Sequence, residues 1–269
     1  MRTVKIIKRG IFRTKTYSVM LPTQWAELST EQFLLIAESF CKDVSDKDFI
    51  SRLIGYSAKN LPVYFLYKIS ECLQFLYSCD TGIDRFFLAR LPDTSFYAPG
   101  NRLKGMTFEQ FMHIDTMFNR YVRNSTDENL NMFVAHVYIR HNECFVLPDN
   151  DKKHFLSIHR KQLLKPSKNA VTIAKRVDKH IKYAVFLNYI LIKHWLSKSF
   201  PFLFPENETS SSSDNRKGKI RIPSVKWLDI FDSFVGDDIA QMDRYRIMPA
   251  TTAFRIMNRR IKESQKNKR

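Results

Sequence analysis

Residues 98–140 constrain the fold most, because they hold two consecutive helical patterns joined by a short break. Thr107 stands three residues before Gln110, which is the spacing of a helix-capping box. Apolar residues then repeat at intervals of three and four in both segments. The connection at residues 124–128 is short, so we expect the two helices to pack antiparallel. This pair is predicted to be the centre of a mainly helical protein.

Two other stretches are expected to be extended. Residues 3–20 carry β-branched runs on both sides of Arg9-Gly10, which predicts a β-hairpin. Short apolar groups between turn residues are compatible with a second short hairpin near residues 86–98. The chain has only 7 glycines in 269 residues, and few glycines disfavour turn-rich sandwiches and barrels. The expected fold class is mainly α: a multi-helix domain with a small N-terminal hairpin and possible second hairpin.

Further helical patterns cover much of the rest of the chain. They lie at residues 30–40, 46–54, 61–77, 178–198 and 223–234, and after Pro249. The pattern at 61–77 is apolar most of the way round, so we expect its aromatic side chains to lie in the core.

Composition divides the chain into three parts. Residues 205–218 are polar and Ser-rich, which is typical of a flexible linker. The linker is predicted to separate a basic helical main domain at 1–204, which includes the N-terminal hairpin, from a C-terminal helical segment with a basic tail at 219–269.

The net charge of +17 at pH 7 is the strongest bulk property of the chain. Charge of that size draws a protein towards polyanions such as nucleic acid, although a solvated basic surface is the simpler alternative. The end of the chain concentrates this charge. Its candidate polyanion-binding residues are Arg255, Arg259, Arg260, Lys262, Lys266, Lys268 and Arg269.

The sequence has no pattern that is typical of an enzyme. Phosphate-binding glycine loops, HExxH and GxSxG are all absent, and the four cysteines form no CxxC pair. We therefore expect a non-enzymatic protein with no catalytic residue, no metal site and no cofactor. The longest apolar run, at 184–192, is shorter than the roughly 18 residues that a membrane-spanning helix needs, so no membrane partner is expected.

An apolar hexapeptide, Phe200 to Pro205, follows the helical pattern at 178–198. Its prolines stop a helix there, so an extended segment is predicted. A segment this apolar must either cover the core or meet a partner.

Three phrases of the sequence occur in a familiar order. The first is Leu21-Pro22 with Trp25-Ala26-Glu27-Leu28 and Glu31-Gln32-Phe33. The second is Pro99-Gly100 through Leu103, with Met106 to Phe111, Asp115-Thr116 and Arg120-Tyr121. The third is Trp227-Leu228, with Gly236 to Ile239 and the apolar helix after Pro249. In this order the chain resembles a family of uncharacterised proteins from tailed phages and prophages of gut Bacteroidetes. Those proteins resemble tail-assembly chaperones in turn.

The resemblance implies a phage morphogenesis protein that acts in the cytoplasm of the infected bacterium, or is present in the virion. Such a protein would bind helical segments of the tape-measure protein by helix-in-groove recognition. The candidate partner contacts are Phe200, Phe202, Phe204, Phe254, Met257 and Ile261. The apolar character of these residues would be explained equally well by packing inside the protein. Two alternatives stay open: a basic nucleic-acid-binding protein, and a structural virion component that contacts the genome.

Overall fold

The computed structural model is mainly helical and describes residues 1–9, 14–42, 44–55, 57, 61–78, 82–140, 168–205, 227–236, 238, 240 and 242–267. The chain divides into two compact units. Residues 1–88 with 178–195 form the first unit, and residues 89–177 with 196–269 form the second. Nearly all of the predicted linker lies outside the described residues, so the domain boundaries at 205–218 stay predictions.

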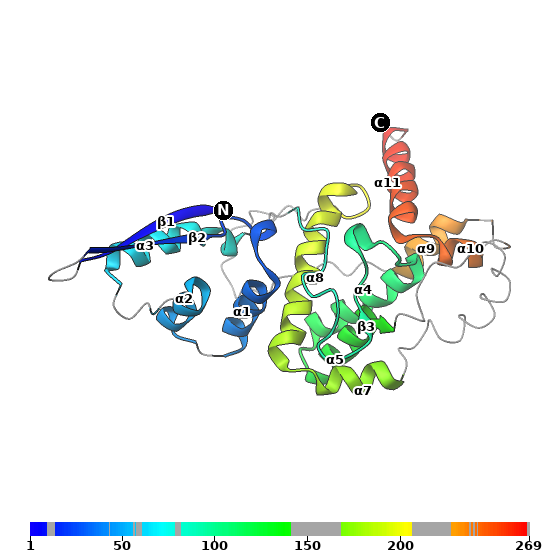
Figure 1. Cartoon of the computed structure of the whole chain (residues 1–269). Helices are drawn as coiled ribbons and strands as arrows, with labels where there is room; N and C mark the ends of the chain where they lie inside the picture. The colour runs from blue at the N-terminus through cyan, green and yellow to red at the C-terminus, as the bar shows by residue number, and fades with distance from the viewer. Residues whose placement is uncertain are drawn as a thin grey trace, which may run out of the picture. The chain divides into compact units, whose positions relative to one another are not determined.

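The first unit contains a two-stranded hairpin on which two short helices pack (Figure 1). Its elements are β1 (Arg2–Arg9), β2 (Thr14–Leu21), a 3-10 helix (Trp25–Glu27), α1 (Thr30–Cys41), α2 (Asp46–Ile54), α3 (Val63–Cys72), a second 3-10 helix (Gln74–Tyr77) and residues 179–195 of α8 (Lys179–Ser199).

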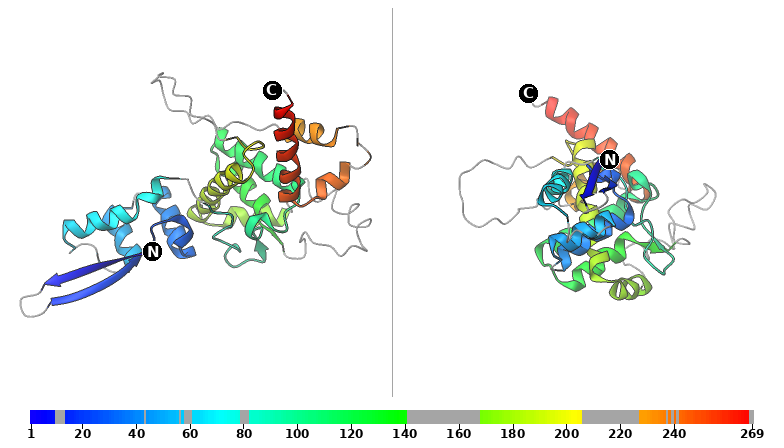
Figure 2. Two further views of the ribbon diagram at one scale, coloured as in Figure 1. Left: turned by 90° about the horizontal axis from the view of Figure 1, so that it is seen from above. Right: turned by 60° about the vertical axis from the view of Figure 1, so that its left-hand side comes forward.

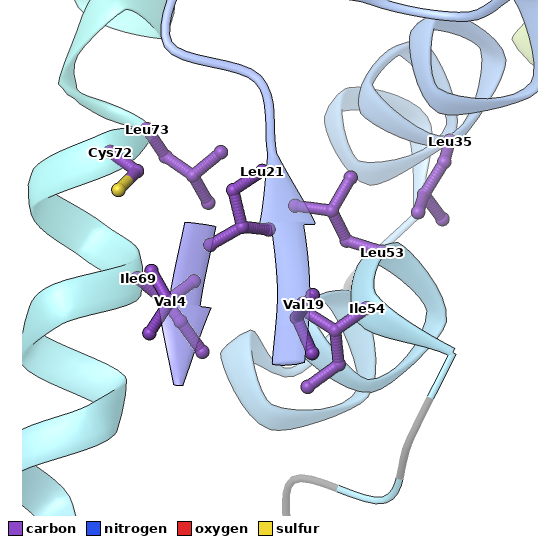
Figure 3. Close-up of a cluster of buried hydrophobic side chains, with 9 residues drawn as sticks. All are labelled: Val4, Val19, Leu21, Leu35, Leu53, Ile54, Ile69, Cys72 and Leu73. Carbon is purple, nitrogen blue, oxygen red and sulfur yellow. The ribbon is translucent and has the colours of Figure 1, made fainter. Parts of the chain in front are cut away.

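The predicted N-terminal hairpin is confirmed. Strands β1 and β2 pair antiparallel, with Val4 opposite Val19, and opposed residues share one face of the sheet. The two valines and Leu21 are buried, and they pack with side chains from α2 and α3, as Figure 3 shows. Alternation along the strands therefore buries one face of the hairpin.

A second cluster of the first unit is built around α1. Ser29 and Gln32 form the capping box that starts this helix. Phe33 stacks on Phe87 with 4.2 Å between ring centroids. The amide of Asn188 on α8 accepts from the Phe87 backbone N–H at 2.6 Å, and this buried side chain is only 2% exposed. The segment before residue 88 is thus fixed to α8.

The pattern at 61–77 gives a shorter helix than predicted, and its side chains do not all lie in the core. Ile69 and Cys72 are buried, but Tyr64, Tyr67 and Tyr77 are exposed. The expectation of a core position was therefore wrong for these three tyrosines. An all-round apolar pattern does not reveal which face of a helix is covered.

The second unit is organised around a helical pair. Its elements are β3 (Phe96–Tyr97), a 3-10 helix (Asn101–Leu103), α4 (Phe108–Arg123), α5 (Asp127–Val137), β4 (Ile139–Arg140), α7 (Lys168–Arg176), the end of α8, α9 (Trp227–Val235), α10 (Met242–Ile247) and α11 (Ala250–Lys266). Helices α4 and α5 pack on each other, with Phe118 and Phe133 in ring contact at 5.8 Å. Thr107 and Gln110 form the predicted capping box.

The second short hairpin is also present. The Leu91 N–H donates to the Phe96 carbonyl at 3.0 Å, and the Ala98 N–H donates to the Ala89 carbonyl at 2.9 Å. Strand β3 pairs in addition with β4, which follows α5. The sequence predicted the hairpin but not this third segment, because pairing over some forty residues leaves no local signal.

Two histidines lie at the interface of α4 and α5. The rings of His113 and His136 are 6.3 Å apart between centroids. Burial lowers the pKa of both side chains, and the neighbouring His136 and Arg246 lower the pKa of His113 further. Both rings are therefore held in the neutral form at neutral pH.

Candidate nucleic-acid interface

Helix α11 is anchored by a buried aromatic side chain. Phe254 is 0% exposed, and its ring lies 4.6 Å from that of Phe111 and 5.3 Å from that of Phe204, measured between centroids. Met257, one turn further on, is also buried. The first half of α11 is therefore part of the core of the second unit.

Backbone hydrogen bonds fix the start of α11 against the start of α4. The Ala250 N–H donates to the Met106 carbonyl at 3.0 Å, and the Phe108 N–H donates to the Met248 carbonyl at 2.8 Å. These bonds also satisfy donors that a helix N-terminus leaves without intrahelical partners. The direction of α11 is thus set by α4.

Helix α9 adds a buried polar contact to the same core. The Trp227 indole N–H donates to the Asp115 carboxylate at 2.7 Å, and the Asn119 amide donates to the same oxygen at 3.1 Å. Asp115 is 0% exposed. Trp227 and Asp115 are 112 residues apart in the chain, and their contact attaches α9 to α4.

Four cations lie along one face of α11: Arg255, Arg259, Lys262 and Lys266. Their spacing of four, three and four residues puts them in a single stripe, and all four are exposed. The buried residues Ala250, Ala253, Phe254 and Met257 lie on the opposite face. We call these four cations the basic stripe. The stripe therefore lies on the exposed face of the helix, and its Lys262 ammonium also lies 5.7 Å from the centre of the Phe202 ring.

The end of α11 is exposed on all sides. Residues 262–267 are each exposed, which follows from the absence of apolar side chains after Ile261. Figures 1 and 2 show the helix leaving α4, α9 and α10 and continuing to the C-terminus. Glu263 is the single acid of α11, and its carboxylate lies 3.9 Å from Arg259.

The remaining predicted cations differ from the stripe. Arg260 points to the unit itself: it donates to the Phe234 carbonyl at 2.7 Å and covers the Phe234 ring at 5.1 Å. Its charge therefore supports the packing of α9. Lys268 and Arg269 lie outside the described residues.

The predicted apolar contacts are mostly internal. Phe204, Phe254 and Met257 are buried, whereas Phe200, Phe202 and Ile261 are half-buried. The hexapeptide is a hydrogen-bonded turn rather than the predicted extended segment, because the Phe204 N–H donates to the Phe200 carbonyl at 2.9 Å.

A side chain of α11 also holds this turn in place. The Asn258 side-chain oxygen accepts from the backbone N–H groups of Phe202 and Leu203 at 2.9 and 3.1 Å. The turn therefore covers the core, and a partner would reach only the half-buried residues of the set.

Sequence reasoning missed a loop beside α11. Arg102 and Leu103 both have φ of 56°, a left-handed conformation that costs a non-glycine residue about 1–2 kcal/mol. The loop contacts α11, and Arg102 and Lys104 are exposed. The only sequence signal was the turn at Pro99-Gly100, which does not predict the contact. The loop thus brings two exposed cations to the surface beside α11.

Sequence reasoning also missed an apolar surface on the first unit. The exposed large hydrophobic residues among those described are Met1, Ile7, Met20, Phe40, Val63, Tyr64, Tyr67 and Tyr77. All of them belong to the first unit. Val63, Tyr64 and Tyr67 share the exposed side of α3, and the Lys68 ammonium lies 5.8 and 5.9 Å from the two tyrosine rings.

Within the described ranges, no three or more His, Cys, Asp or Glu side chains are grouped so that they could hold a metal ion. None of the helices described is both long and apolar enough to cross a bilayer. Comparisons with protein-family models, with curated proteins and with solved structures return no significant match.

Proposed function

We propose that this protein binds nucleic acid without catalysis, and that the basic stripe of α11 is its principal contact. The observation that carries the proposal is the position of the stripe opposite the buried face of the helix. If a cation also packed against the core, its contribution to folding would already explain its presence, and ligand binding would not be needed to account for it. Arg255, Arg259 and Lys266 are on the side of the helix that the core does not use, whereas the Lys262 ammonium also lies 5.7 Å from the centre of the Phe202 ring.

The dimensions of the stripe suit a polyanion. From Arg255 to Lys266 it spans twelve residues, whose eleven steps cover about 16 Å of helix. Double-stranded DNA carries one negative charge for every 1.7 Å or so of its axis. Every cation of the stripe would therefore have phosphates within reach, and binding would release condensed counterions. The net charge of +17 adds long-range attraction for the same ligand.

Replacing the stripe with glutamine (Arg255→Gln, Arg259→Gln, Lys262→Gln and Lys266→Gln) is expected to weaken binding and its dependence on salt. Because this variant can no longer neutralise up to four phosphates, the slope of log K against log salt becomes shallower by about 3–4 for duplex DNA. The measurement is fluorescence anisotropy of a labelled duplex at several salt concentrations.

The matched control replaces Arg120, Arg123, Lys175 and Arg176 with glutamine. These four residues are exposed in the same unit, and both variants lose four positive charges. The control is expected to retain most of the salt slope of the wild type. If the salt slope falls equally in the two variants, net charge alone determines binding and the stripe has no special role.

We propose a second candidate function on a separate observation, the exposed apolar side of α3. Binding of tape-measure helices, which the phage resemblance implies, needs an exposed apolar surface. Val63, Tyr64 and Tyr67 supply one on the first unit. In this function the protein would act in the cytoplasm of the infected host, or remain in the virion.

The test of this second function is the aggregation of a tape-measure fragment, followed by light scattering. The wild type is expected to suppress aggregation at equimolar concentration, and Tyr64→Ser with Tyr67→Ser is expected to lose most of this effect. Tyr77→Ser is the control, because Tyr77 is exposed in the same unit but lies outside α3. An unchanged suppression in the double variant would refute the role of α3.

A further inference from the structure

The exposed end of α11 has the size and chemistry of a groove-binding element. Residues 262–266 extend about 7.5 Å along the helix axis, and all are exposed. The major groove of B-form DNA is about 12 Å wide and 8.5 Å deep, and it admits an α-helix of about 10–12 Å diameter. The diameter of the exposed end is therefore compatible with the width of this groove.

The side chains at this end favour a polar, anionic surrounding. From Lys262 to Asn267 the helix carries cationic, amide and hydroxyl groups, one carboxylate, and no apolar group. Glu263 is beside Arg259, so its charge is partly compensated. A protein groove that accepts a helix needs apolar anchors at helical spacing. This segment has none, whereas Lys262 and Lys266 would face the phosphates that border a DNA groove.

Other nucleic acids do not fit the same geometry. The minor groove of B-DNA is about 6 Å wide, which is narrower than a helix. The major groove of A-form RNA is deep and narrow, so that side chains do not enter it. A single strand has no groove, and it would contact the cations equally well if the segment were not helical.

We infer that the ligand is double-stranded DNA in the B form, and that residues 262–267 of α11 enter its major groove. This inference rests on the proposed nucleic-acid function, and it adds the class of nucleic acid and the mode of contact. The stripe contacts phosphates along the groove, while the anchored half, from Ala250 to Met257, holds the helix against the second unit.

The test separates helix shape from charge. Ser264→Pro removes a backbone donor and clashes with the carbonyl of Arg260, so it breaks the helical end without changing its charge. Ser264→Ala is the control that keeps the helix. Affinities of the full-length chain are measured for three probes: a 24-base-pair DNA duplex, an RNA duplex of the same sequence and a single strand of equal charge. A duplex of this length has about two turns of groove.

The DNA duplex is expected to bind about tenfold or more tightly than the RNA duplex. Ser264→Pro is expected to remove this preference, while binding to the single strand stays unchanged. If Ser264→Pro binds the DNA duplex as the wild type does, and the glutamine variant of the stripe does not, groove entry is wrong and the proposed function stands. If neither change affects binding to any probe, the proposed function fails as well.

A second measurement keeps the inference testable if the proline lowers the melting temperature of the protein. Bulky substituents at the C5 position of thymine fill the major groove and leave the phosphates in place. A duplex modified in this way is expected to bind the wild type about tenfold less tightly than the unmodified duplex, because the groove is obstructed. Equal affinity for the two duplexes would overturn groove entry.

Discussion

Phe254→Ala is expected to lower the free energy of unfolding by about 3–5 kcal/mol, the usual cost of removing a buried phenylalanine. Phe254 is 0% exposed, and its ring contacts those of Phe111, Phe200 and Phe204. No small movement of one helix would close the cavity, because the surrounding rings come from α4 and from the turn after α8. Urea unfolding followed by circular dichroism is the measurement.

Phe254→Leu is the control for this prediction. It retains most of the apolar volume, so it should cost less than the alanine variant. Removal of the exposed neighbouring side chain, Arg255→Ala, should change the free energy of unfolding by no more than about 0.5 kcal/mol. If Phe254→Ala lowers the free energy of unfolding by no more than Arg255→Ala does, α11 does not pack as described.

Trp227→Phe is expected to destabilise the protein by about 1.5–3 kcal/mol, the range for a hydrogen bond to a charged group. The substitution keeps a ring in place but removes the indole N–H that donates to Asp115 at 2.7 Å. Burial of the Asp115 carboxylate makes the removal of a donor costly, because water cannot replace it.

A double-mutant cycle with Asp115→Asn measures the interaction itself. If the bond from Trp227 to Asp115 carries the effect, Trp227→Phe should cost less in the Asp115→Asn background than in the wild type. Additive effects of the two substitutions would mean that the indole contributes by its volume alone.

Local signals in the sequence predicted the elements of the fold well. A three-residue spacing between a hydroxyl residue and a glutamine predicts a capped helix start, and it occurs in Ser29 with Gln32 and in Thr107 with Gln110. The hairpin at the N-terminus was similarly visible, since alternation around a turn is a property of neighbouring residues.

Contacts between distant residues could not be predicted in this way. The pairing of Trp227 with Asp115, and of Phe254 with Phe111, depends on how helices are placed in space, and each residue looks ordinary in its own segment. The exposure of Tyr64 and Tyr67 was missed for a related reason. Periodicity defines the faces of a helix, but the elements packed around it decide which faces are covered.

The candidate interface was predicted in part. The sequence indicated the cations of the chain end as a group, but it could not divide them by role. The helix geometry separates Arg260, which supports the packing of Phe234, from the stripe that begins at Arg255. The loop at Arg102 is relevant because it contacts α11, and no spacing in the sequence predicts this contact.

The opposite placement of the basic stripe and the buried face of α11 has a consequence for how this protein can change over generations. In the proposed function, substitutions at Arg255, Arg259 or Lys266 would alter the attraction for nucleic acid, and we expect them to cost little folding energy because these side chains are exposed. Substitutions at Phe254 or Met257 do the reverse. On this proposal, affinity and stability depend on different residues of one helix, so natural selection could adjust one property with little change in the other.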